Sequence, residues 1–402
     1  MTEDQKAVIT ATVPLLRANG VLLTKHFYKR MFSHHPELKN LFNMGNQQQG
    51  KQQTALAMAV LAYAEHIADP SVLLPVVDRI GHKHVSLDIR PEQYQIVGKH
   101  LIASIAEVLG EAASVAILDA WTAAYGQLAA LMSGHEAMLY RKQVENDGWS
   151  GWRPFRVLRK VDESTEITSF YLAPADGGKV VRHLPGQFVS LRVFLGELQL
   201  NQARQYSLSS RPDGSYYRIS VKREIGIDLN TNGMISNHLH DRVSVGDIVE
   251  LTAPSGTFTL PENIDGPVTF LSGGVGLTPL ISMLEELLEK GSGYPVTWLH
   301  GCRGERVHAF KGQLDQFEKA YDHFSQEVFY NQTTRANRVL GIREGFLDIA
   351  YSSAFSVHPQ GQYFICGPTV FIQKQFQDLV GAGVKKENIH FEEFGPQTLS
   401  LN

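Results

Sequence analysis

The chain has 402 residues, of which 43% are hydrophobic and 19% charged, and its formal net charge at pH 7 is −4. This length suggests two or three domains of ~150 residues each, and the composition is that of globular domains, not of a disordered chain. The small charge gives no electrostatic reason to expect a nucleic acid or an anionic membrane as partner. No apolar run approaches the ~20 residues of a membrane span, and the N-terminus lacks a signal-peptide core. The two cysteines form no disulfide framework. We therefore expect a cytoplasmic protein without obligate membrane association, which we take to be monomeric.

Residues 1–146 carry apolar side chains at helical spacing and no long run that alternates like a strand. One stripe ends at His84, a second begins after Pro91, which suits the first turn of a helix, and a third leads to Glu136. The apolar members of the first stripe are Leu73, Val76, Val77 and Ile80. Gly134 is expected to weaken the end of the third helix. The sequence therefore predicts an all-α domain over residues 1–146.

The pattern changes at the turn-rich joint 147–151. After it, short alternating or β-branched runs are separated by Gly, Pro and Asp clusters, which is typical of an antiparallel barrel or sandwich. We predict an antiparallel β-barrel domain over residues 147–262. In the last part of the chain, apolar strand candidates alternate with helical stretches such as 278–290 and 368–381. This alternation favours a doubly wound α/β domain with a parallel sheet over residues 263–402.

Arg204-Gln205-Tyr206-Ser207 is predicted to lie on a strand of the middle domain. A flavin needs an aromatic face to stack on, a hydroxyl near its redox-active nitrogen and a cation for its pyrophosphate. Arg204, Tyr206 and Ser207 supply all three from one extended segment, with the first two on the same side. Taken alone, the segment is more simply an ordinary strand with a surface arginine.

Two further motifs follow it in the chain. Val221-Lys222-Arg223-Glu224 continues on a predicted strand, and the segment from Gly233 to Ser236 is predicted to open a helix, whose free N–H groups suit a phosphate. In this order the three motifs resemble those of the ferredoxin-reductase-like flavoproteins, which implies one bound FAD. The resemblance implies these flavin-site residues: Phe188, Arg204, Gln205, Tyr206, Ser207, Lys222, Gly233 and Ser236. The segment Glu224–Asn232 is longer than the usual link between the second and third motifs.

A glycine-rich stretch, Leu271–Pro279, lies between a predicted strand and a predicted helix. Its glycines let the backbone approach a pyrophosphate, although a tight strand-to-helix turn has the same pattern. The predicted nucleotide contacts are Gly273, Gly274, Val275, Gly276, Leu277 and Thr278. By the same resemblance, Cys366, Gly367 and Pro368 lie at the nicotinamide, and the closing segment of Glu393, Phe394, Gly395 and Pro396 lies against the flavin. Many relatives carry another residue, often Cys, at the position of Glu393.

The choice between NADH and NADPH stays open at this point. Arg303 and Arg306 follow the second predicted strand of the nucleotide domain. They could meet a 2′-phosphate or be solvated loop charges, and the latter is the simpler interpretation.

His84 is the predicted haem ligand among sixteen histidines. It falls on an apolar stripe, and haem is a large apolar disc. His82 would point ~200° away, at ~100° per helical residue. In globins one such histidine holds the haem iron.

The first 140 residues resemble the globin half of the flavohaemoglobins almost throughout, for example in HFYKRMF, PELKNLFNM, KHVSLDIRPEQY and LDAWTAAYG. The resemblance implies a distal side with Tyr28, Gln52, Phe42 and Leu56, and a proximal pair, Tyr94 and Glu136, behind His84. It also suggests that Lys83 and Glu392 pair and tune the redox centres. Without the family, Tyr28 could be a core aromatic, and Tyr94 and Glu136 a helix-packing contact.

As a whole the chain resembles the flavohaemoglobins. The resemblance implies a nitric oxide dioxygenase that oxidises NO with O2 to nitrate, with electrons passed from NAD(P)H through FAD to one haem b. Three alternatives remain: a haem-linked reductase of lipid or alkyl hydroperoxides, a globin gas sensor or carrier, and a flavin reductase with a degenerate globin.

Overall fold

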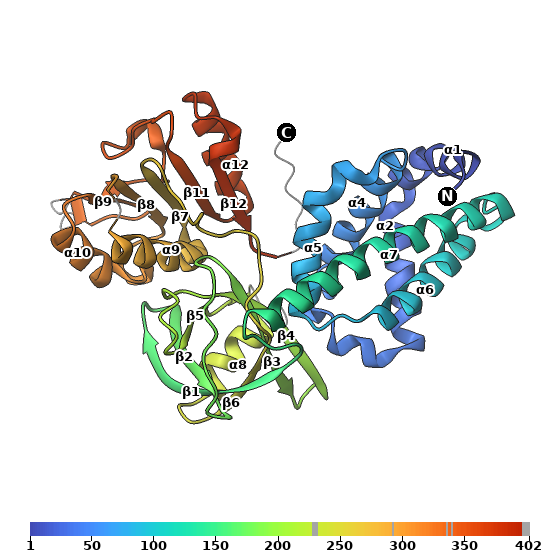
Figure 1. The fold of residues 1–402 in the computed structure, drawn as a ribbon, viewed down its shortest axis with the longest axis horizontal. Helices are drawn as coiled ribbons and strands as arrows, with labels where there is room; N and C mark the ends of the chain where they lie inside the picture. The colour runs from blue at the N-terminus through green and yellow to red at the C-terminus, as the bar shows by residue number, and fades with distance from the viewer. Residues whose placement is uncertain (227–231, 292, 335–336, 339–340, 396–402) are drawn as a thin grey trace. The chain divides into compact units, whose positions relative to one another are not determined.

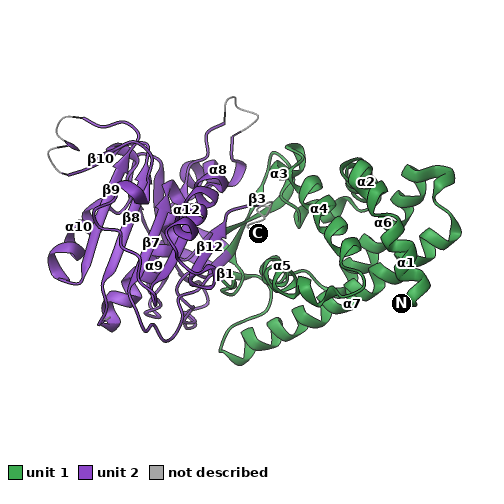
Figure 2. Ribbon diagram, turned by 90° about the horizontal axis from the view of Figure 1, so that it is seen from above, with its two compact units in different colours: residues 1–153, 190–205, 250–257 green, residues 154–189, 206–249, 258–402 purple. Residues whose placement is uncertain are grey.

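The computed structural model describes residues 1–226, 232–291, 293–334, 337–338 and 341–395. The chain divides into two compact units (Figure 2). Unit 1 comprises residues 1–153, 190–205 and 250–257, and unit 2 comprises residues 154–189, 206–249 and 258–402.

The N-terminal part of unit 1 is helical throughout (Figure 1). Its helices are α1 (Glu3–Ala11), α2 (Val13–His34), α3 (Met44–Gln48), α4 (Lys51–Glu65), α5 (Leu74–Ser86), α6 (Pro91–Leu109) and α7 (Val115–Glu145), with short 3-10 turns at Pro36–Asn40, Pro70–Leu73 and Gly110–Ala112. Pro91 stands in the first turn of α6, where its missing N–H costs no hydrogen bond. The predicted all-α domain is confirmed.

The expectation that Gly134 weakens the end of its helix is wrong, because α7 continues to Glu145. Met132 and Glu136, on either side of this glycine, are both buried. Their burial holds the helix together against the ~1 kcal/mol that one interior glycine costs.

By length and composition, α7 is apolar enough to cross a membrane, and α1 with α2 would pass the same test as one span bent by 66°. The sequence interpretation did not foresee this. Helix α7 packs against α1, α5 and α6. One apolar cluster joins α1, α2, α4, α6 and α7, and its largest fully buried side chains are Phe27, Ile9, Met31 and Ile105.

The middle of the chain forms a six-stranded sheet. Its strands are β1 (Arg153–Asp162), β2 (Ile167–Pro174), β3 (Phe188–Leu195), β4 (Leu200–Ser207), β5 (Tyr217–Lys222) and β6 (Ile248–Leu251), in the order β4-β3-β6-β1-β2-β5. The pairs β1–β2, β2–β5 and β3–β6 are antiparallel. A bridge between Leu208 and Ile219 brings the end of β4 to β5, the other end of the strand order. Helix α8 (Met234–Arg242) follows β5. The predicted antiparallel β domain is confirmed.

The C-terminal part forms a second six-stranded sheet, whose order is β10-β9-β8-β7-β11-β12 and whose strands are parallel. The strands are β7 (Val268–Gly273), β8 (Val296–Cys302), β9 (Phe324–Tyr330), β10 (Arg343–Glu344), β11 (Gln362–Gly367) and β12 (Ile389–Glu393). Helices α9 (Leu277–Lys290) and α10 (Lys311–Ala320) pack on one face and α12 (Thr369–Gly381) on the other. This arrangement confirms the predicted doubly wound sheet.

Within unit 2, a buried ion pair joins β5 to α9. Arg218 Nη2 lies 2.7 Å from Glu285 Oε1, and the two side chains are 7% and 10% exposed. The same carboxylate accepts hydrogen bonds from Gln313 Nε2 and from the backbone N–H of Arg211, both at 2.8 Å. A charge buried at this depth is tolerated only with such partners.

We expect Arg218→Met to lower the free energy of unfolding by about 3–5 kcal/mol, because it leaves Glu285 buried without its cation. The Arg218→Met/Glu285→Met double variant removes both charges and should recover much of that loss. Thermal unfolding of the cofactor-loaded protein measures both effects. A double variant as unstable as the sum of the two single variants would contradict the pairing.

Candidate functional site

Three helices of unit 1 bring a histidine, a tyrosine and a glutamate together. His84 stands in the last turn of α5, and its Nδ1 lies 2.7 Å from Glu136 Oε1 on α7. The Tyr94 hydroxyl, from α6, lies 2.9 Å from the same Nδ1 and donates to Glu136 Oε1 at 2.5 Å. Burial first, and then the hydrogen bond to Glu136, raise the pKa of Tyr94, which keeps it a neutral donor.

This arrangement fixes which nitrogen of His84 can bind a metal. A hydrogen bond from Nδ1–H to the carboxylate leaves the lone pair on Nε2, the tautomer that a ligating histidine needs. Glu136 is only 2% exposed, so its carboxyl group needs these two hydrogen-bond partners. His82 has a different environment, because its Nδ1 accepts a hydrogen bond from the backbone N–H of Gly256 at 3.0 Å. The geometry suits a haem on the Nε2 side of His84, and that assignment stays a prediction.

Tyr28 lies on α2 and is 5% exposed. Its ring meets that of Phe42 edge-on, with the centroids 5.7 Å apart. Burial raises the pKa of the Tyr28 hydroxyl, while the side chains of Gln47 and Gln52 act on it as hydrogen-bond partners and lower the pKa by less. The hydroxyl is therefore a neutral donor in a dry environment. Leu56 follows Gln52 by one turn of α4 and packs against the same core.

Sequence reasoning missed two glutamines of this cluster. Gln53 Nε2 donates to Gln47 Oε1 at 2.8 Å and to the backbone oxygen of Gln47 at 3.1 Å. The glutamine-rich run from Gln47 to Gln53 was the available signal, and only Gln52 was used. Gln47 Nε2 and Gln52 Oε1 are buried without a hydrogen-bond partner among the described residues. Unsatisfied polar atoms beside apolar side chains fit a site whose polar ligand completes the hydrogen bonding.

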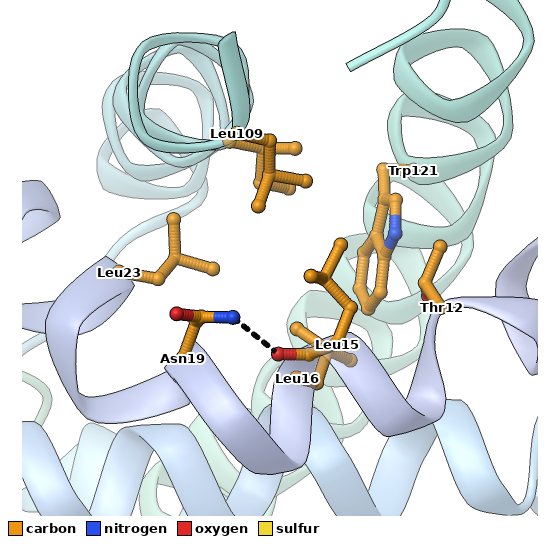
Figure 3. A pocket seen from close by; sticks show the side chains of 8 residues that line it. Thr12, Leu15, Leu16, Asn19, Leu23, Leu109 and Trp121 are labelled. Atoms are coloured by element: carbon orange, nitrogen blue, oxygen red, sulfur yellow. Dashed lines mark hydrogen bonds between the residues drawn. The ribbon is translucent and has the colours of Figure 1, made fainter. Parts of the chain in front are cut away.

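A small apolar cavity lies elsewhere in the same helices (Figure 3). Its lining comprises Thr12, Leu15, Leu16, Asn19, Leu23, Ile105, Leu109 and Trp121. The predicted haem contacts differ from all of these residues, and we assign the cavity no part in the site.

Arg204, Tyr206 and Ser207 lie on β4, as the strand prediction required. Arg204 and Ser207 are half-buried, as is Phe188 at the start of β3. The Arg204 guanidinium donates to the backbone oxygen of Ala203 at 2.6 Å. Their roles toward a flavin stay predictions.

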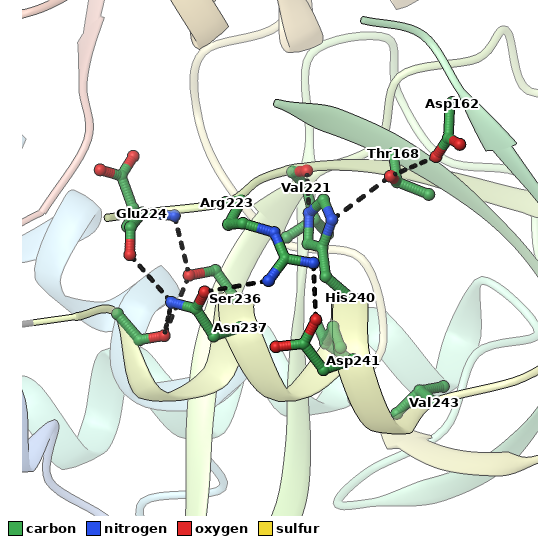
Figure 4. Close-up of polar contacts among 12 residues, drawn as sticks. Asp162, Thr168, Val221, Arg223, Glu224, Ser236, Asn237, His240, Asp241 and Val243 are labelled. Atoms are coloured by element: carbon green, nitrogen blue, oxygen red, sulfur yellow. Dashed lines mark hydrogen bonds and ion pairs between the residues drawn. The ribbon is translucent and has the colours of Figure 1, made fainter. Parts of the chain in front are cut away.

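The second and third flavin motifs meet at the start of α8 (Figure 4). The backbone N–H of Gly233 donates to the oxygen of Glu224 at 2.9 Å, and the N–H of Glu224 donates to Ser236 Oγ at 3.2 Å. A Cβ on Gly233 would lie 2.6 Å from Ser236 Oγ, so only glycine fits there. Within the described part of the chain, the first turn of α8 has no side-chain cap, which leaves its N–H groups for a phosphate. Lys222 pairs with Glu224 at 3.1 Å. The middle of the long link, residues 227–231, lies outside the described residues.

The opposite end of α8 is capped by a lysine that the sequence did not reveal. Lys160 Nζ, from β1, donates to the backbone oxygens of Leu239, His240 and Val243 at 3.3, 3.2 and 2.6 Å. A cation at the C-terminus and an anion at the N-terminus both complement the helix dipole. Lys160 thus satisfies the last carbonyls of the helix whose first turn is predicted to meet the FAD pyrophosphate.

In the parallel sheet, the glycine-rich loop after β7 packs directly on the end of β11. A Cβ on Gly276 would lie 2.2 Å from the backbone oxygen of Cys366, and one on Gly367 would lie 3.2 Å from Gly273. Gly274 has φ +54° with open space beside it, as a loop that admits a ligand to its backbone requires. Thr278 Oγ1 donates to the oxygen of Val275 at 3.1 Å. The structure therefore brings two predicted nucleotide motifs together at the carboxyl ends of the strands.

The remaining predicted residues are placed as follows. Burial raises the pKa of the Cys366 thiol well above its usual range, so this cysteine is no thiolate at neutral pH. Arg303 forms an ion pair with Glu166, and the backbone oxygen of Arg306 accepts a hydrogen bond from Thr165 Oγ1. Both loop residues therefore have contacts within the protein in the absence of a nucleotide. Lys83 lies on α5 and Glu392 on β12, and their pairing stays a prediction. Pro396 lies outside the described residues.

We expect His84→Ala to lose most bound haem, or its normal axial ligation, while FAD content stays unchanged. Glu136→Gln should keep the haem but weaken electron donation through His84, since a neutral amide replaces the carboxylate at Nδ1. Absorption and resonance Raman spectra of the ferrous protein measure both changes. Full haem occupancy with an unaltered iron–histidine band in His84→Ala would contradict the assignment.

Lys160→Met should weaken FAD binding by about three- to tenfold, the size of a partly buried helix-terminus interaction, while keeping the apolar stem. Fluorescence titration of the FAD-depleted protein measures the dissociation constant. Lys160→Arg is the matched control and should retain most of the affinity. Equal affinities in the Met and Arg variants would mean that the charge at the end of α8 does not act on the flavin.

Models of three families match consecutive parts of the chain. They are described as Globin (residues 25–132), Oxidoreductase FAD-binding domain (154–260) and Oxidoreductase NAD-binding domain (270–376). These matches lie inside the three predicted domains, whose boundaries at 146 and 262 stay predictions. The chain is accordingly an oxidoreductase with haem, FAD and a nicotinamide nucleotide as its cofactors.

Relatives match over almost the whole length. Proteins named flavohemoprotein from Bordetella parapertussis and Chromobacterium violaceum are 50% and 49% identical over 400 and 399 residues, which is 98% of this chain and 98% of each relative. The crystal structure of a flavohemoglobin from Malassezia yamatoensis with bound FAD and heme is similar with a TM-score of 0.86 and 25% identity, over 98% of this chain and 99% of that one. A solved FAD/NAD-binding domain of a nitric oxide dioxygenase from Vibrio cholerae matches 61% of this chain and 99% of its own at 37% identity, with a TM-score of 0.55. The chain therefore belongs to the flavohemoprotein family.

Proposed function

We propose that this flavohemoprotein is a nitric oxide dioxygenase, which oxidises NO with O2 to nitrate at the expense of NAD(P)H. The observation that carries the proposal is the hydrogen-bonded set of His84, Tyr94 and Glu136, with Nδ1 of the histidine 2.7 Å from a buried carboxylate. A carboxylate behind a ligating histidine increases its electron donation to iron, which suits O2 activation better than reversible storage. The name of the Vibrio cholerae protein with a similar reductase part agrees with this activity.

Haem supplies the iron that binds O2, and FAD supplies electrons one at a time from a two-electron donor. The chain's own residues orient and protect these steps. Glu136 and Tyr94 hold the His84 ring in one orientation and one tautomer. Tyr28 would donate a hydrogen bond to the haem ligand from a neutral phenol, because burial raises the pKa of its hydroxyl. The apolar neighbours Phe42 and Leu56 keep bulk water from competing for that donor.

The distal glutamines control the direction of the Tyr28 hydrogen bond. Gln53 Nε2 donates two hydrogen bonds to Gln47, one to its side-chain oxygen and one to its backbone oxygen. Thr24 Oγ1 donates to the backbone oxygen of Gln53 at 2.9 Å. The side chains of Gln47 and Gln52 lower the pKa of the Tyr28 hydroxyl, by less than burial raises it. With haem bound, this network would leave the Tyr28 phenol proton available to the haem ligand, which would slow the dissociation of O2.

The reductase domains argue against a gas sensor or carrier, since reversible binding needs no nicotinamide-dependent electron supply. No observation on this chain favours hydroperoxides over NO. The hydroperoxide reductase is therefore an outcome to be tested, not a second proposal.

Tyr28→Phe should raise the O2 dissociation rate of the ferrous protein about tenfold or more, the effect of losing one hydrogen bond to a partly charged acceptor. NO consumption should fall accordingly. Stopped-flow spectroscopy and an NO electrode measure the two quantities. Tyr63→Phe is the matched control, because Tyr63 is a buried tyrosine of the same domain that donates to the oxygen of Ala124. An unchanged dissociation rate would remove Tyr28 from the mechanism, and a higher turnover of alkyl hydroperoxide than of NO would overturn the proposed substrate.

A further inference from the structure

Glu393 is a buried acid at the end of β12. It is 4% exposed, and Thr369 Oγ1 donates to its Oε1 at 2.6 Å. Thr369 is the first residue of α12, whose N-cap is Pro368, and the first turn of α12 contains no acidic residue. Glu393 therefore supplies, from a neighbouring strand, the negative charge that complements the positive end of this helix.

The sheet register places this carboxylate near the nucleotide loop. Glu393 pairs with Gly367 on β11, and Cys366 pairs with Ser272 at the end of β7. Two strand spacings of ~4.8 Å each put Glu393 about 10 Å from the glycine-rich loop, along the carboxyl edge of the sheet. Ligands of doubly wound sheets bind outside this edge. A dinucleotide with its pyrophosphate on the loop extends one end toward β11 and β12 and the other toward β8 and β9.

The predicted flavin contact of the closing segment implies that the nicotinamide lies on the β11–β12 side. Phe394, which directly follows β12, is 44% exposed and belongs to the segment predicted to face the flavin. Hydride transfer requires the nicotinamide and the flavin to be in contact. The ring that reacts therefore lies on the same side of the loop as Glu393.

We propose that Glu393 makes this site bind the oxidised nicotinamide nucleotide more tightly than a neutral residue would. When the C4–H bond breaks, the hydride and its electron pair pass to the flavin, and the nicotinamide ring gains a positive charge. A buried carboxylate beside the ring stabilises that charge, which favours flavin reduction and slows product release. The NADH ring is neutral and gains no such stabilisation.

A cysteine in place of Glu393 would carry no charge. A buried thiol is neutral, as the raised pKa of the nearby Cys366 illustrates. The inference depends on the nicotinamide-dependent reductase shared by the family and not on NO as substrate. Its failure and the failure of the proposed function are therefore distinguishable.

The test is a titration of the oxidised, FAD-loaded full chain with NAD+, followed by isothermal calorimetry and by perturbation of the flavin spectrum. We expect Glu393→Gln, which is nearly isosteric, to raise the dissociation constant of NAD+ about three- to tenfold. ADP-ribose, which lacks the nicotinamide ring, should bind both proteins equally. With ferricyanide as electron acceptor, the inhibition constant of NAD+ should rise by the same factor.

Two further variants separate charge from shape. Glu393→Asp keeps the charge and should restore part of the NAD+ affinity, whereas Glu393→Cys should resemble Glu393→Gln. FAD content and the melting temperature verify that each variant is folded. An unchanged NAD+ affinity in Glu393→Gln, or an equal loss for NAD+ and ADP-ribose, would overturn the proposal.

Discussion

The hydrogen bond between His84 Nδ1 and Glu136 Oε1, 2.7 Å long, is the constraint on which the globin domain depends. A carboxyl group that is 2% exposed is costly to bury, and it is tolerated only with good hydrogen-bond partners. The partners come from α5 and α6, whereas Glu136 comes from α7, so the three helices must keep their relative positions. Because this hydrogen bond uses the proton on Nδ1, the lone pair of the neutral His84 ring is on Nε2. One buried carboxyl group thus couples the packing of three helices to the electronic character of the histidine predicted to bind the haem iron.

The reductase part relies on helix ends in place of a buried histidine. Helix α8 presents the N–H groups of its first turn at Gly233 and receives Lys160 at its other end. Helix α9 follows a loop in which Gly276 allows the backbone to touch β11. Helix α12 receives Glu393 from the adjacent strand. Each of these helix ends lies at a charge of opposite sign or at a site where an anion is expected. Helix N-termini can therefore bind a polyanionic cofactor although the chain has a small net charge.

The sequence predicted the three fold classes and the positions of the motifs, because hydrophobic periodicity and turn residues are local signals. Helix α7 shows the limit of such signals: Gly134 argues locally for a break, and burial of Met132 and Glu136 overrides it. The proximal residues were found through the family resemblance and the spacing from His84 to Tyr94, since α5 and α6 are consecutive. Lys160 was missed because its partners are backbone oxygens at the end of α8. Gln47 was missed because its partner is the side-chain amide of Gln53. No periodic pattern encodes a contact between a strand lysine and a helix end 79 residues later.

The two acidic residues at the end of β12 illustrate why a family resemblance is insufficient at the level of one side chain. Glu392 is half-buried, whereas the next residue, Glu393, is only 4% exposed. The strand alternation turns these neighbours to opposite faces, so Glu393 meets Thr369 at the start of α12 and is buried there. The helix terminus offers this carboxylate a partial positive charge, and a nicotinamide that becomes cationic would bring a full one. The proposed effect of Glu393 is therefore a preference of the site for the oxidised over the reduced nucleotide.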